Sequence, residues 1–75
     1  MQEGGLSPLA IHRLIRKAGA ARVGGDAVEE LRKVLEELGV RIGKEAMELA
    51  THARRKTVKS DDIRLAVKKI IVLIK

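Results

Sequence analysis

The chain has no cysteine, no aromatic residue and only one proline among its 75 residues. Without cysteine it can form neither disulfides nor thiolate metal sites, and its two histidines are too far apart in sequence to suggest a metal site. We therefore expect no metal and no cofactor. Without Phe, Tyr or Trp the core must be aliphatic. A chain this short usually needs disulfides, a metal or self-association to bury enough surface, so self-association is the remaining expectation.

Long apolar runs are missing as well. No stretch approaches the roughly 18 apolar residues that a membrane span needs. The N-terminal sequence MQEGGLSP has no basic segment followed by an apolar one, so it does not predict a secretory signal, and we expect an intracellular, cytoplasmic location. The apolar share of 45% is ordinary for a globular protein, and one folded domain is expected.

The chain does have an amphipathic stretch, which runs from Asp26 to Ala53. Its apolar residues recur at steps of three and four, which places them on one side of an α-helix, with Glu, Arg and Lys on the other. At 1.5 Å per residue the helix would be about 40 Å long. A compact monomer of this chain length has a diameter of only about 30 Å. The apolar side therefore needs a further cover, most simply a second copy of the chain.

Two shorter helices are predicted beside this stretch. Ser7-Pro8 combines an N-cap residue with proline at the first helical position, and Gly19 is a natural stop. Ser60 gives a second N-cap signal, because Asp61 and Asp62 follow it in the first turn. The expected fold class is all-α, in the order short helix, long central helix, short helix.

The segments outside these helices are short. We expect residues 1–6 to be a flexible tail. Segments 22–24 and 57–59 could pair with each other as short extended pieces. Residues 71–75, with the sequence IVLIK, form an apolar C-terminal extension. We favour one more helical turn packed on the same dimer of two chain copies. The alternative is a patch that contacts another dimer or pairs as a strand.

Charge is distributed unevenly along the chain. The net charge of +6 divides into +3 for residues 1–25, −3 for residues 26–53 and +6 for residues 54–75, counting Lys and Arg against Asp and Glu. The central helix is thus acidic and both flanks are basic. Basic flanks of this kind suggest a polyanionic partner, with nucleic acid as the first candidate. The alternative is the Lys/Arg-rich surface of a heat-adapted protein.

Three segments carry a family resemblance. They read IHRLIRKAGAARV at 11–23, LEELG at 35–39 and EAMELATHARRKTVKSDDIRLAVKK at 45–69, and the run HARRKTVKSDDI is the most specific piece. The chain resembles an archaeal histone, a minimal histone fold, over about residues 7–70. The resemblance implies a handshake dimer with crossed long helices, which agrees with the length argument.

The resemblance also implies a role for individual residues in binding double-stranded DNA. Arg22 of the first loop would enter the minor groove, where the negative potential is enhanced. Arg13 on the first helix, together with Lys56, Thr57 and Lys59 around the second loop, matches phosphate-contacting or structural positions. For Arg22 the alternative is an ordinary solvated loop charge.

Two further contacts follow from the resemblance. Leu49, His52 and Asp62 match a contact between dimers, with a His–Asp hydrogen bond across it. Arg55 and Asp62 match an ion pair within one chain that braces the second loop. We expect no enzyme activity, because His52 and Asp62 come without a nucleophile, a metal set or a pocket.

The chain departs from the family pattern at several loop positions. Gly24 and Gly25 replace a serine and an acid, which should loosen the positioning of Arg22. Arg54 replaces a residue that is often glycine, and Arg64 one that is often acidic. Lys33 and Arg64 would repel each other where neighbouring turns of wrapped DNA approach.

The expected function is to bind, bend and compact double-stranded DNA with little sequence preference, in the nucleoid. The protein would act as a homodimer that assembles into tetramers or longer filaments. The alternative is a histone-fold subunit that pairs with a different chain in a transcription-factor-like complex. A weaker alternative is a membrane-surface peptide built from the basic, apolar C-terminus.

Overall fold

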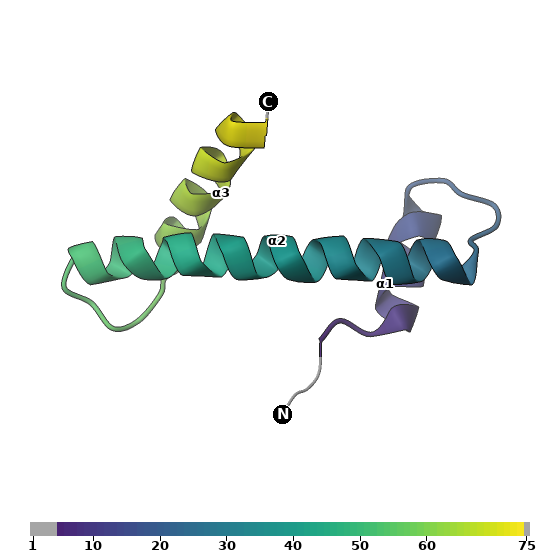
Figure 1. The fold of residues 1–75 in the computed structure, drawn as a ribbon, viewed down its shortest axis with the longest axis horizontal. Coiled ribbons are helices and arrows are strands. Elements are labelled where there is room, and N and C mark those ends of the chain that lie inside the picture. Colours follow the sequence, from purple (N-terminus) through teal and green to yellow (C-terminus); the bar gives the residue numbers. More distant parts are fainter. Residues whose placement is uncertain (1–4, 75) are drawn as a thin grey trace. The chain divides into compact units, whose positions relative to one another are not determined.

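The described part of the chain consists of helices joined by short loops (Figure 1). A computed structural model describes residues 5–74. The helices, in chain order, are α1 (Pro8–Lys17), α2 (Gly25–His52) and α3 (Ser60–Ile74). The predicted all-α order of short helix, long helix and short helix is confirmed. Segments 22–24 and 57–59 are not strands, and no strand is present in the described residues.

The chain falls into two compact units, residues 1–37 and residues 38–75. The first unit holds α1 and the N-terminal half of α2. The second holds the C-terminal half of α2, the second loop and α3. With 28 residues, α2 amounts to about 42 Å of helix at 1.5 Å per residue. None of the helices of the described chain is long and apolar enough to cross a membrane.

Local signals set both ends of α1. The Ser7 hydroxyl accepts a hydrogen bond of 3.0 Å from the Ala10 N–H, and Pro8 occupies the first turn, as predicted. At the other end the Gly19 N–H donates to the Arg16 carbonyl at 2.9 Å, and the Ala20 N–H donates to the Ile15 carbonyl at 3.5 Å. This pair of bonds is a Schellman motif, which requires a left-handed residue after the helix, and Gly19 has φ +113°.

The start of α3 differs from the prediction. Ser60 is the first helical residue rather than the N-cap. The Lys59 carbonyl accepts from the Ile63 N–H at 3.2 Å, so Lys59 occupies the N-cap position. The Asp62 carboxylate accepts from the Lys59 N–H at 2.8 Å. The helix is therefore capped by an acid that reaches back from the first turn, and a hydroxyl at the cap is not needed.

The apolar extension continues α3 as helix through Ile74. The alternative of strand pairing is therefore wrong for residues 71–74, while Lys75 lies outside the described residues. Ile71 and Val72 are 48% and 72% exposed. What these two side chains contact in the assembly stays a prediction.

The core of each unit is aliphatic and small. Ile11 and Val28 are buried in the first unit, and Ala46, Ala50, Ala66 and Ile70 in the second. Many large apolar side chains are exposed along all three helices and the second loop. They include Leu14, Val34, Val40, Met47, Val58 and Leu65. The described chain thus leaves much of its own apolar surface uncovered.

The segment before α1 is attached to α2. The Leu6 N–H donates to Glu36 Oε2 at 2.9 Å, and Arg32 donates to the other carboxylate oxygen of Glu36 at 2.9 Å. Gly5 has φ +101°, and a Cβ at this position would collide with Glu36 Oε2. The flexible tail at residues 1–6 stays a prediction, and residues 1–4 lie outside the described residues.

We predict that Gly5→Ala releases this segment from α2. An L side chain is strained at this φ and also displaces the Glu36 carboxylate. Because a hydrogen bond of this kind contributes about 1 kcal/mol, hydrogen exchange at the Leu6 amide should become roughly fivefold faster. Exchange measured by NMR tests the change. Gly25→Ala is the matched control, because a Cβ there meets nothing within 4 Å. Unchanged Leu6 exchange in the Gly5→Ala protein would contradict the interpretation.

Candidate functional site

The second loop begins with a tight end to α2. The Arg54 N–H donates to the Thr51 carbonyl at 2.9 Å, and the Arg55 N–H donates to the Ala50 carbonyl at 2.9 Å. These are the two bonds of a Schellman motif. Arg54 occupies the left-handed position with φ 60°, and it is the single non-glycine residue with positive φ among those described. For an L residue this conformation costs roughly 1 kcal/mol.

An ion pair between Arg55 and Asp62 closes the loop. Arg55 Nη1 lies 2.9 Å from Asp62 Oδ2, and Arg55 Nη2 lies 2.8 Å from Oδ1, so the pair is bidentate. Arg55 also donates to the Thr57 carbonyl at 2.9 Å. The Asp62 side chain is only 4% exposed. The end of α2, the middle of the loop and the start of α3 are therefore held by one guanidinium and one carboxylate.

These contacts shift both ionisation equilibria in the direction of the charged forms. The hydrogen bond from the Arg55 guanidinium, followed by that from the Lys59 N–H, lowers the pKa of Asp62 to about 2. The hydrogen bond to Asp62 raises the pKa of Arg55. Burial acts against both shifts and is outweighed. The loop thus keeps its ion pair through the mildly acidic range and loses it only as the pH falls towards 2.

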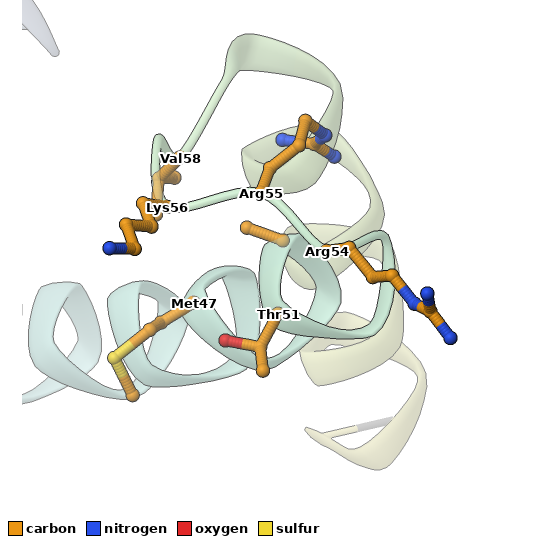
Figure 2. A pocket seen from close by; sticks show the side chains of 7 residues that line it. Met47, Thr51, Arg54, Arg55, Lys56 and Val58 are labelled. Atoms are coloured by element: carbon orange, nitrogen blue, oxygen red, sulfur yellow. The ribbon is translucent and has the colours of Figure 1, made fainter.

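The basic residues of the second loop lie on the outside of this braced structure. Lys56, Thr57 and Lys59 are all exposed. A hollow of about 410 Å³ lies beside Lys56 (Figure 2), and its lining residues are Met47, Ala50, Thr51, Arg54, Arg55, Lys56 and Val58. The hollow has an apolar floor on α2 and a cationic rim from the loop.

The first loop lies in the other unit. Arg22 is exposed in it, and Arg13 is exposed on α1. Arg16 Nη1 donates to the Ala21 carbonyl at 3.4 Å, which links the loop to α1. The Gly24 carbonyl accepts from the Ala27 and Val28 N–H groups and so begins α2. The predicted DNA-contacting residues therefore form two exposed sets, one in each unit.

The residues predicted to join dimers do not share one environment. Leu49 is half-buried and His52 is exposed, both near the end of α2. Asp62 is buried and already accepts three hydrogen bonds within the chain. The family resemblance implies His52 and Arg55 as partners of Asp62, and the structure shows the pair with Arg55. The contact between dimers stays a prediction.

Further ion pairs reduce the effective charge of α3. Arg64 bonds to Asp61 at 2.7 Å, and Lys69 bonds to Glu45 on α2 at 2.8 Å. The sequence predicts Arg64 as added positive charge near the second loop, whereas the acid three residues before it is the signal that indicates the pair. Within residues 5–74 no three His, Asp or Glu side chains are grouped as a metal site.

We predict that Asp62→Asn destabilises the protein in a pH-dependent way. The pKa of Asp62 is about 2 in the folded chain and about 3.9 when unfolded. Its stabilising effect is therefore present above about pH 4 and is lost as the pH falls towards 2. At neutral pH the midpoint of thermal unfolding should fall by roughly 5 °C or more.

Melting curves followed by circular dichroism at one chain concentration test this prediction. The wild-type and Asp62→Asn curves should converge at the acid end. Asp61→Asn is the control, because Asp61 forms an exposed pair and should change the midpoint little. A gap between wild type and Asp62→Asn that does not depend on pH would contradict the assignment.

Comparisons with known proteins identify the family. A family described as histone-like transcription factor (CBF/NF-Y) and archaeal histone matches residues 6–67. The chain is 60% identical over 62 residues to one of the subunits of the archaeal histone HAN1 from Thermococcus zilligii, and the match covers 81% of this chain and 92% of that protein. It is 41% identical over 56 residues to probable archaeal histone 3 of Methanocaldococcus jannaschii, and this match covers 75% of this chain and 84% of that protein. The resemblance inferred from the sequence is confirmed, and the chain belongs to the family of archaeal histones and histone-like transcription factors.

Proposed function

We propose that the protein binds double-stranded DNA as a homodimer, and that it bends and compacts the DNA in the nucleoid with little sequence preference. The observation that carries the proposal is the braced second loop, whose lysines are exposed while the buried acid that braces it, Asp62 of α3, is paired with Arg55. Membership in the histone family supports the same conclusion. The proposed role is structural, and no reaction step is involved.

The proposed contacts are made mainly to phosphates. Lys56 and Lys59 would neutralise phosphate groups beside the second loop, with Thr57 between them. Arg13 would do the same from α1. Each neutralised phosphate releases counterions, so binding should weaken steeply as salt rises. Such contacts position the DNA without reading its sequence. Arg22 would enter a compressed minor groove, which favours flexible base steps.

The proposed dimer is the handshake arrangement, with the α2 helices crossed. Its support is the apolar side of α2, which the described chain covers only in part: Val34 is 47% exposed, and Leu31, Leu38 and Ile42 are half-buried. Partly exposed apolar residues in such number are typical of an interface. Dimers would then join through Leu49, His52 and Asp62 into tetramers or filaments along DNA.

A second candidate is a histone-fold subunit that pairs with a different chain. Two observations favour it. The matching family includes histone-like transcription factors, and the relative from Thermococcus zilligii is itself named as one subunit of a histone. Such a protein would use the same apolar surface of α2 for another partner. It would need the basic residues of the two loops much less.

The DNA-binding proposal predicts a position-specific effect of charge removal. Arg22→Ala combined with Lys56→Ala should weaken binding to a duplex and lower the slope of log affinity against log salt, by about 0.9 for each phosphate that is no longer neutralised. Gel shifts over a salt series measure both quantities. Lys33→Ala combined with Arg41→Ala is the control, because it removes the same charge from exposed positions on α2. Equal losses of affinity and of salt slope in the two double variants would contradict the proposed DNA-binding surface.

The dimer proposal predicts that a charge on the apolar side of α2 prevents self-association. Val34→Glu should give a monomer by sedimentation, with loss of helical signal, because burying an unpaired carboxylate in an interface is very costly. Val40→Glu is the matched control, because position 40 lies on the other side of the helix and is 58% exposed, so this protein should remain dimeric. A wild-type chain that sediments as a monomer would favour the heterodimer candidate.

A further inference from the structure

The two Schellman motifs of this chain differ at one position. After α1 the left-handed residue is Gly19, and after α2 it is Arg54. The hydrogen bonds are equivalent in the two turns. Glycine adopts this conformation without strain, whereas arginine does not. A strained residue at a surface turn is a reason to look for a use of its side chain.

The fold itself makes no polar use of the Arg54 side chain. Arg54 is exposed, and in the part of the chain that the structure describes its guanidinium has no hydrogen bond or ion pair. The neighbouring arginines differ in this respect, because Arg55 is paired with Asp62 and Arg64 with Asp61. Arg54 also adds a positive charge beside Arg55 and Lys56, which is unfavourable without an external anion.

We propose that Arg54 contacts a phosphate of the DNA backbone and so enlarges the DNA-binding surface of the second loop. Figure 2 shows the Arg54 and Lys56 side chains leaving the loop in different directions, so the two residues would contact different phosphates. The Schellman bonds fix the Arg54 backbone, which limits the conformational entropy lost on binding. This inference rests on the proposed DNA-binding function.

Three substitutions separate the charge of Arg54 from its backbone conformation. Arg54→Gly removes both the charge and the strain. Arg54→Ala removes the charge and keeps an L residue at positive φ. Arg54→Lys keeps the charge and the strain. Thermal melts report the conformational effect, and duplex binding from about 50 to 200 mM salt reports the phosphate contact.

The salt slope should depend on whether the residue at position 54 is charged. Arg54→Gly and Arg54→Ala should both lower the salt slope by about 0.9 per chain, and Arg54→Lys should keep the wild-type slope. Arg54→Gly should melt no lower than wild type although it binds DNA more weakly. Arg41→Ala, on α2 and away from the loop, is the control that removes one charge.

Two results would overturn the inference. One is a wild-type slope in Arg54→Gly and Arg54→Ala. The other is a slope lowered as much by Arg41→Ala, which would indicate net charge alone. A lower melting midpoint in both neutral variants at an unchanged slope would assign Arg54 to the helix end instead. Failure of the wild-type chain to bind duplex DNA would refute the proposed function itself, which distinguishes the two failures.

Discussion

The second loop depends on a single buried carboxylate. Asp62 receives both Nη groups of Arg55 and the N–H of Lys59, so one side chain joins the end of α2 to the start of α3. A buried charge of this kind is tolerated because its oxygens are paired and hydrogen-bonded. The exposed Lys56 lies between the paired residues, and its position follows from them. A basic surface with a defined shape is thus built around an acid.

The interior of the protein is made of unusually small side chains. Ala46, Ala50 and Ala66 are almost completely buried, whereas Val40 and Met47 on the long helix α2 are more than half exposed. Alanine allows helices to approach closely but buries little apolar area per residue. The chain alone therefore has little to offset the entropy of folding. Under the proposed dimer, folding and association are one process, and stability depends on chain concentration.

The sequence predicts correctly those helix ends that are set by residues within one turn of them. Ser7, Pro8 and Gly19 set the ends of α1 as predicted, because each acts within one turn of its own position. Ser60 was misassigned, because the Asp62 carboxylate, three residues from Lys59, supplies the cap from within the helix. Both residues were visible in the sequence, but nothing local distinguishes the two ways of capping.

Other features depend on pairs that are distant in sequence or on backbone geometry. The Arg55–Asp62 pair was expected only from the family resemblance, since spacing alone gives no such pairing. Glu36 and Leu6 are thirty residues apart, and no periodicity links them. The left-handed conformation of Arg54 has no signal in the residue itself, because arginine does not mark such a position, and only the family pattern, which often has glycine there, points to it.

The contact between Gly5 and Glu36 constrains the residue at position 5, although the two positions are distant in sequence. Any L residue at position 5 displaces the carboxylate, and even without the carboxylate the backbone φ of +101° favours glycine there. Glycine at position 5 is thus favoured for two independent reasons, the backbone conformation and the space that the carboxylate occupies. Loss of Glu36 should therefore leave the preference for glycine at position 5 in place, whereas Gly25, with open space around it, carries no such steric constraint.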